Sequence, residues 1–181
     1  RAVGKGAVIF LAWLVSYLQK QAIWIVFVIF FAIGVFMFLL PPIPGPPVYL
    51  TGGIVIVGAL EESMGFWGGV AICGLMCWFV KLFSCMLQQK CIGEPLGNKV
   101  SIRAMCAVNT PQMRAIKVIL LQKGLPIDKL AVLCGGPDWP TSVLCGIIRV
   151  PLHEAMLGTA PVIVLYLMYV VISGAVQLKI G

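Results

Sequence analysis

Six ionisable side chains lie in segments of this chain that are otherwise apolar. They are Glu61, Glu62, Asp138, Arg149, His153 and Glu154. Charges are costly in a hydrocarbon setting, so residues of this kind are candidates for transport or for ion pairs. Carboxylates in a low dielectric hold their protons more strongly, which suits proton coupling. An arginine keeps its charge and suits a counter-ion or a clamp for a phosphate headgroup.

Each candidate also has a simpler interpretation. Glu61, Glu62, His153 and Glu154 could stand in headgroup water at the ends of their segments. Asp138 lies between two prolines, where an aspartate commonly caps an Asx-turn. His153 is the only histidine, and a single imidazole is weak support for a metal or for the magnesium of chlorophyll.

Other chemistry has little support in the sequence. There is no Ser-His-Asp order, no glycine-rich phosphate loop and no cluster with metal-ligand spacing. We therefore expect no enzyme, no metal and no cofactor, with chlorophyll at His153 as the one alternative. The seven cysteines lie mostly in apolar runs and are expected to act as small hydrophobic side chains.

Two related segments carry all six of the ionisable candidates. Residues 40–65 match residues 133–158 without gaps at eight positions, where about two are expected by chance. The matches are Leu40/Leu133, Pro44/Pro137, Pro47/Pro140, Gly53/Gly146, Ile54/Ile147, Val57/Val150, Glu61/Glu154 and Gly65/Gly158. Paired apolar segments interrupted by Gly and Pro indicate the binding site of a transporter-like repeat. The alternative is a coincidence between two proline-rich turns.

The composition favours a membrane protein. The chain has 181 residues, of which 61% are hydrophobic and 10% are charged, and its mean hydropathy is +1.06. Residues 22–40 and 65–87 predict spanning helices, and residues 155–176 predict the last span. The apolar run 7–18 is shorter and predicts an interfacial or tilted helix.

The interrupted segments should form the backbone of two hairpins. Pro44, Pro47 and Gly53 mark the first, over residues 41–64, and Pro137, Pro140 and Gly146 mark the second, over residues 131–148. Five prolines between residues 41 and 47 argue against a straight helix from Leu40 to Ile54. Such backbone is tolerated at membrane depth where protein or a wet cavity shields it.

The charge distribution sets the predicted topology. No Lys or Arg occurs from Gln21 to Val80. If both hairpins dip in and return, eleven of the thirteen cations lie on one side, as the positive-inside tendency requires. The hairpins then enter from opposite faces, and the chain is an inverted repeat.

The basic connection, residues 88–130, should lie outside the membrane. Thr110 followed by Pro111 predicts a helix start, and Gly124 predicts the end of that helix. Arg114 and Lys117 are one turn apart and are candidates for contacts with lipid phosphates. A solvated or protein-covered face is the alternative. Cations that flank apolar spans favour membrane lipids over nucleic acid as partners.

These features resemble the DedA/VTT-domain (SNARE-associated) family of membrane proteins. The resemblance covers roughly residues 22–177. It rests on Pro42-Ile43-Pro44-Gly45, the following Gly52-Gly53, Glu61, Gly65-Phe66-Trp67-Gly68 and Pro137-Asp138-Trp139-Pro140 through Gly146 to Gly158. It implies two facing re-entrant hairpins and the movement of lipids between leaflets, by scrambling in eukaryotic members and by proton-coupled lipid-carrier transport in bacterial ones.

The resemblance also assigns roles to residues. Acidic residues in the first hairpin and arginines in the second are implicated in the family, and Glu61 matches the first pattern. The arginine ahead of the second hairpin's prolines is absent here, since Cys134 and Gly135 occupy that position, and Arg149 comes later.

We therefore predict an all-α integral membrane protein. It would be an inverted repeat with two re-entrant hairpins, about three spanning helices and an interfacial N-terminal helix. The predicted parts are residues 1–21, the repeat half 22–87, the connection 88–130, and the second hairpin with the last span, 131–181. Its expected role is lipid movement between leaflets. The alternative is a structural subunit of a larger membrane complex, for example a photosynthetic or respiratory one, with other subunits as partners and with contacts to pigment or lipid. For either role the sequence does not define the organelle, and an endomembrane and a plastid membrane both fit.

Overall fold

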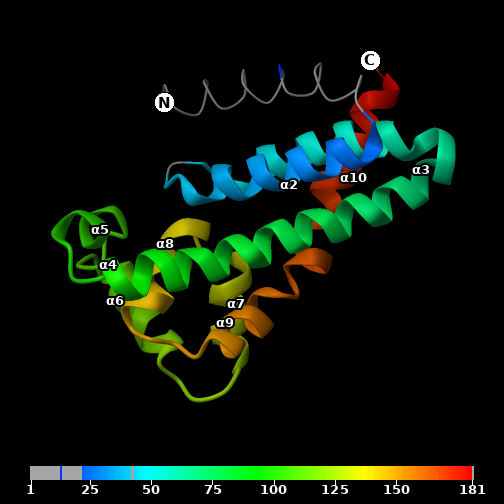
Figure 1. The fold of residues 1–181 in the computed structure, drawn as a ribbon. Coiled ribbons are helices and arrows are strands. Elements are labelled where there is room, and N and C mark those ends of the chain that lie inside the picture. Colours follow the sequence, from blue (N-terminus) through cyan, green and yellow to red (C-terminus); the bar gives the residue numbers. More distant parts are fainter. Residues whose placement is uncertain (1–12, 14–21, 42, 181) are drawn as a thin grey trace. The chain divides into compact units, whose positions relative to one another are not determined.

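The computed structural model describes Trp13 and residues 22–41 and 43–180, and it is all-helical over that part of the chain (Figure 1). The predicted N-terminal interfacial helix, apart from Trp13, lies outside the described residues. The helices are α2 (Ile23–Leu39), α3 (Gly45–Leu87), the π-helical η1 (Gln88–Gly93), α4 (Glu94–Leu96), α5 (Val100–Met105), α6 (Pro111–Leu120), α7 (Ile127–Gly135), α8 (Asp138–Ile147), α9 (Leu152–Thr159), the π-helical η2 (Ile163–Leu167) and α10 (Met168–Ile180).

Within the described residues, two helical stretches are long and apolar enough to cross a membrane. They are Gly45–Leu96 and Leu152–Gln177, and α2 is apolar but shorter, at 17 residues. These stretches agree with the predicted membrane location. The chain divides into two compact units. The first contains the chain up to Val80 together with the segment from Ile163, and the second contains Lys81–Val162.

The stretch Leu40–Ile54 is not one straight helix, as expected, because α2 ends at Leu39 and α3 begins only at Gly45. Helix α3 begins at Gly45 and includes Pro46 and Pro47. Both prolines stand in the first turn, where backbone N–H groups have no intrahelical partner, so their missing donors cost nothing. The break comes at Gly65 instead, whose φ of 72° and ψ of 170° belong to a region that is essentially restricted to glycine. Helix α3 therefore has a first arm, residues 45–64, and a second arm, residues 66–87.

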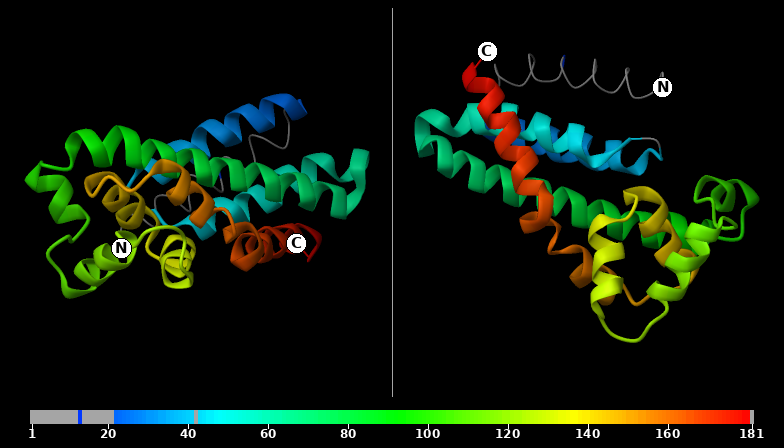
Figure 2. Two further views of the ribbon diagram at one scale, coloured as in Figure 1. Left: turned by 90° about the horizontal axis from the view of Figure 1, so that it is seen from below. Right: turned by 180° about the vertical axis from the view of Figure 1, so that it is seen from behind.

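In the first unit, the first arm of α3 packs closely on α10. A Cβ atom built on Gly53 would lie 2.2 Å from the carbonyl oxygen of Val171, and one built on Gly174 would lie 2.2 Å from that of Leu50. Figure 2 shows the two helices crossing. Because any side chain at either glycine would meet backbone, this crossing depends on both residues.

The second arm of α3 packs on the first arm through small residues, among them Gly69, Cys73 and Cys77, which are spaced four residues apart. A Cβ atom on Gly69 would lie 3.3 Å from the Cα of Val57, and one on Gly52 would lie 2.9 Å from the Sγ of Cys77. Small residues at such interfaces let helix backbones approach closely in lipid.

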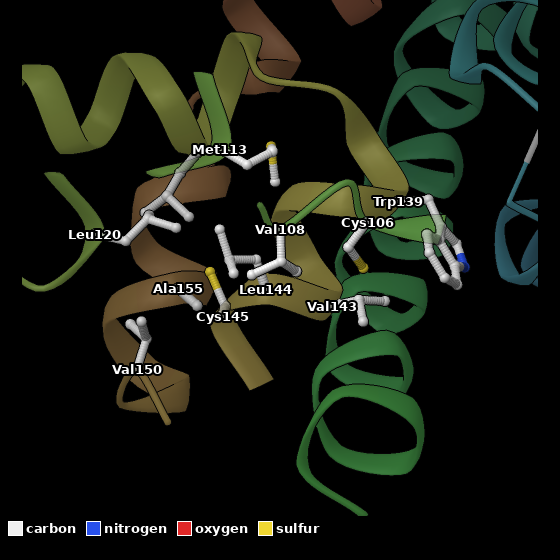
Figure 3. Packing of buried hydrophobic residues seen from close by; sticks show 11 residues of the cluster. Cys106, Val108, Met113, Leu120, Trp139, Val143, Leu144, Cys145, Val150 and Ala155 are labelled. Carbon is white, nitrogen blue, oxygen red and sulfur yellow. The ribbon is translucent and has the colours of Figure 1, made fainter. Parts of the chain in front are cut away.

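The second unit has its own apolar core (Figure 3). The core is formed by Cys106, Val108, Met113, Leu120, Leu133, Trp139, Val143, Leu144, Cys145, Val150 and Ala155. Helix α8 lies against η1 at another glycine pair. A Cβ atom on Gly93 would lie 2.5 Å from the carbonyl oxygen of Val143, and one on Gly146 would lie 2.4 Å from that of Gln89.

The predicted helix after Thr110 is present as α6. The Thr110 hydroxyl accepts a hydrogen bond from the Met113 amide at 3.3 Å, which is the expected N-cap. The helix ends at Leu120, before the expected position, and Gly124 has a φ of +75° in the turn that follows.

Candidate functional site

The second hairpin places Asp138 beside a buried lysine. Helices α7 and α8 are joined by a turn at Gly136 and Pro137, and Asp138 is the first residue of α8. A carboxylate at that position is favoured by the partial positive charge of the helix N-terminus. It accepts a hydrogen bond from Nζ of Lys81, on the second arm of α3. Thus Asp138 forms an ion pair, rather than the Asx-turn cap considered as its alternative.

Burial makes this ion pair unusual. The Lys81 side chain is 4% exposed and that of Asp138 is 19% exposed. A charge in such a setting is retained only when it is paired and hydrogen-bonded. Lys81 is also the one charged residue between Gly65 and Leu87, which is an apolar run. The pair therefore places a buried positive charge, Lys81, within a candidate membrane span and holds it with a carboxylate from α8.

A small cavity adjoins the ion pair. Its volume is about 10 Å³, roughly the space that one water molecule needs. Polar groups line it beside the pair, namely the hydroxyls of Thr141, Ser142 and Thr159 and the thiols of Cys85 and Cys145. Thr141 is buried, and within the described part of the chain its hydroxyl has no hydrogen-bond partner. The cavity thus offers polar groups to a guest of about the size of a water molecule.

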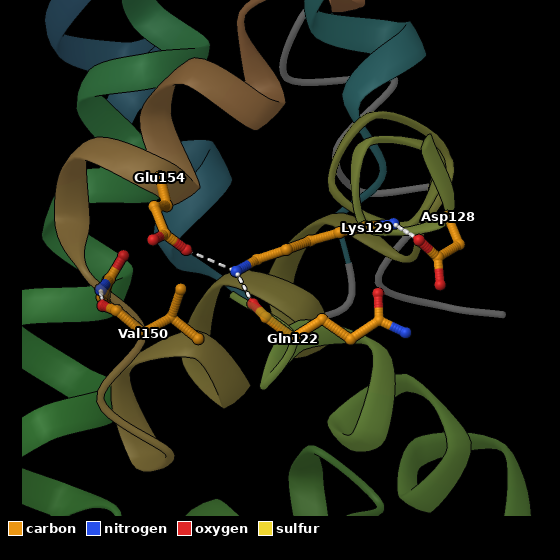
Figure 4. A network of polar contacts seen from close by, with 6 residues as sticks. Gln122, Asp128, Lys129, Val150 and Glu154 are labelled. Carbon is orange, nitrogen blue, oxygen red and sulfur yellow. Dashed lines mark hydrogen bonds and ion pairs between the residues drawn. The ribbon is translucent and has the colours of Figure 1, made fainter. Parts of the chain in front are cut away.

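A second buried lysine holds Glu154 (Figure 4). Nζ of Lys129, in α7, lies 2.5 Å from Oε2 of Glu154, in α9, and donates to the carbonyl oxygen of Gln122 at 2.9 Å. The Lys129 side chain is 1% exposed and that of Glu154 is 19% exposed. The candidate Glu154 therefore closes a link between α7, α9 and the end of α6.

The other ionisable candidates lie nearer the surface. In the first unit, Glu61 pairs with Lys179 at 2.8 Å, and the Lys179 ammonium stands 4.7 Å from the centre of the Phe66 ring. Glu62 is exposed. In the second unit, Arg149 and His153 are both exposed. Arg149 has a φ of 57°, just after α8 ends.

The predicted hairpin residues fall at corresponding places. Pro44 and Pro137 immediately precede α3 and α8, while Pro47 and Pro140 lie in the first turn of those helices. Gly53 and Gly146 are the close-contact glycines of their units.

The remaining candidates lie at the surface of the second unit. Arg114 and Lys117 are exposed on α6. Among the described residues there is no group of three or more His, Cys, Asp or Glu that could hold a metal ion. His153 stands exposed at the start of α9, and its predicted role toward chlorophyll stays a prediction.

Sequence reasoning missed both lysines. Lys81 carried a usable signal, because it is an ionisable residue inside an apolar run, yet it is not among the candidates predicted from the sequence. Lys129 carried no such signal, because it follows Asp128 in a basic connection and its burial comes from packing. Protein-family models, curated proteins and solved structures were all compared with this chain, and none of them matches it.

Proposed function

We propose that this chain is a DedA/VTT-like membrane protein that moves lipids between leaflets through a polar path at its second hairpin. The observation that carries the proposal is the buried ion pair of Lys81, which lies in a candidate span, with Asp138 of α8, beside a polar cavity. A lipid headgroup would slide along this path while its tails stay in the bilayer.

Burying Lys81 and Asp138 costs the free energy of removing two charges from water. Replacing a buried ion pair with apolar side chains is often neutral or stabilising, so stability alone does not require Lys81 and Asp138. When the ion pair separates, its ammonium would face the phosphate of a headgroup and its carboxylate would face the amine. Charged residues at membrane depth commonly mark substrate pathways.

The inverted repeat is part of the proposal, and the glycine contacts support it. Gly174 approaches Leu50 and Gly53 in the first unit, and Gly93 approaches Val143 and Gly146 in the second. The pairs 50/53 and 143/146 are separated by the same 93 residues as the sequence repeat. Corresponding faces of α3 and α8 thus meet a glycine on another helix, as expected for two copies of one packing unit.

A structural role is the second candidate. The cavity has a volume of about 10 Å³, which is far smaller than a phospholipid headgroup, and both buried lysines are held by carboxylates. A closed, paired arrangement of this kind suits a subunit that only supports a larger complex. Lipid movement requires the path beside the Lys81–Asp138 pair to open, whereas a structural role does not.

Exchange of fluorescent lipid between leaflets tests the proposal. The purified chain is reconstituted into vesicles, and dithionite bleaches the labelled lipid in the outer leaflet. Lipid movement predicts bleaching beyond that of empty vesicles. The double variant Lys81→Met with Asp138→Leu should fold and yet lose the exchange, because it keeps the packing and removes both charges.

A matched variant separates this effect from a general loss of charge. Lys90→Met with Glu94→Leu removes an exposed lysine–carboxylate pair from the second unit and should leave exchange unchanged. If the native chain gives no exchange above empty vesicles, the structural role is favoured. If the Lys81 and Asp138 double variant exchanges lipid normally, the proposed path is wrong.

A further inference from the structure

One stretch of the second unit combines exposed cations with exposed apolar side chains. Residues 95–127 contain no acidic residue. Their five cations are all exposed, namely Lys99, Arg103, Arg114, Lys117 and Lys123. We refer to these residues, which include α5 and α6, as the basic platform.

Helix α6 shows how the two kinds of side chain are arranged. Arg114, Lys117, Val118 and Leu121 follow one another at spacings of three, one and three residues, so they share one helical face. Val118 is 67% exposed and Leu121 is 56% exposed. The neighbouring face, about a quarter turn away, carries Met113 and Leu120, which are buried in the core (Figure 3). The exposed stripe therefore belongs to a helix that is anchored along an adjacent face.

Apolar exposure extends beyond α6. Val100, Met105 and Ile127 are each more than half exposed. These residues share a stretch of chain with the five cations, and exposed apolar side chains interspersed with cations are typical of an interaction surface. Apolar side chains that enter the acyl boundary between cations that reach phosphates are typical of interfacial helices.

We propose that the basic platform docks on an anionic lipid surface. Charge complementarity carries the choice of partner, since five exposed cations without an acid attract a negative leaflet and repel a basic one. Val118 and Leu121 would enter the boundary between headgroups and acyl chains. Arg114 and Lys117 would contact the phosphates. The proposal needs the membrane location but not lipid transport, so the two can fail separately.

An environment-sensitive fluorophore on α6 tests the docking. Val118→Cys is labelled in a Cys91→Ser background, which removes the exposed native thiol. The chain is placed in phosphatidylcholine vesicles with or without about a third of phosphatidylserine. Docking predicts a blue-shifted emission in the anionic vesicles, reversed at about 1 M salt because screening shortens the Debye length to about 3 Å.

Matched variants sharpen the result. Gln112 lies on a different side of α6, so a fluorophore at Gln112→Cys should show a much smaller shift. Lys117→Gln should raise the anionic lipid needed for half of the Val118 shift, with binding weakened about fivefold. Lys90→Gln removes a cation that already pairs with Glu94 and should change little.

Three outcomes would overturn the docking proposal. One is an equal shift in neutral and anionic vesicles. Another is an equal shift at Val118 and Gln112. The third is a shift that polyglutamate produces and anionic vesicles do not, which would instead indicate an acidic protein partner.

Discussion

The two members of the Lys129–Glu154 pair should differ in their effect on stability. Lys129 is 1% exposed, while Glu154 is 19% exposed and can still reach water. Glu154→Leu leaves a buried ammonium with one remaining partner, the carbonyl oxygen of Gln122 at 2.9 Å. Lys129→Met leaves a carboxylate that is partly solvated. Removing the carboxylate should therefore lower the free energy of unfolding more than removing the ammonium does.

The expected magnitudes follow from this difference. Breaking a buried pair from one side costs about 3–5 kcal/mol, and we expect this range for Glu154→Leu. For Lys129→Met the partial exposure of Glu154 lowers the expected cost to about 1–3 kcal/mol. The double variant removes both charges and replaces them with apolar volume. Its free energy of unfolding should lie within about 1 kcal/mol of that of the native chain. The effects of the two single substitutions are therefore far from additive.

Unfolding in mixed micelles measures these values. A denaturing detergent is titrated into the protein in a mild one, and helix content is followed by circular dichroism. Lys90→Met and Glu94→Leu are the controls, since this pair is exposed on both sides and each change should cost less than about 1 kcal/mol. The reasoning fails if Lys129→Met costs more than Glu154→Leu, or if the double variant is as unstable as the worse single one.

Two further predictions concern packing. Gly146→Ala should destabilise the second unit by about 1–3 kcal/mol, because its Cβ atom would lie 2.4 Å from a carbonyl oxygen. The control is Gly135→Ala, whose Cβ atom meets nothing within 4 Å, and it should be close to neutral in the same unfolding titration. Maleimide should modify one thiol of the folded chain, the exposed Cys91, since the other cysteines are buried. Burial raises the pKa of the Cys106 thiol to about 11, so its reaction should stay slow from pH 7 to 9 until the chain is unfolded; rapid labelling of Cys106 in the native state would show that the core is open.

Local chemistry made several parts of the fold predictable. The charge-free run 22–40 became α2, and the Thr110-Pro111 pair became a helix start with the expected N-cap. The two prolines after Gly45 misled the interpretation, because a proline breaks a helix interior but is tolerated in the first turn. Sequence alone does not say where a first turn will fall, and so the start of α3 at Gly45 was not predicted.

Of the four residues that form the two buried ion pairs, only the carboxylates were predictable from the sequence. Asp138 and Glu154 were singled out as costly charges, and both occupy partly buried ion pairs. Their partners come from 57 and 25 residues away along the chain, and nothing in local sequence specifies that pairing. The burial of Lys129 is likewise a product of tertiary packing. The roles of all four residues in transport stay predictions.

The two ends of α8 are held by different kinds of contact, and this decides where the second hairpin could open. Gly146, near the C-terminal end, packs against the backbone of Gly93 and Gln89. Because this contact is made by backbone atoms, rotation of a side chain cannot release it. Asp138, about 12 Å away along the helix axis, is held by the flexible side chain of Lys81. Water or a charged headgroup can replace an ion-pair partner, whereas it cannot replace a backbone contact of close-packed glycines. Any opening that admits a headgroup should therefore start at the Asp138 end and pivot about Gly146.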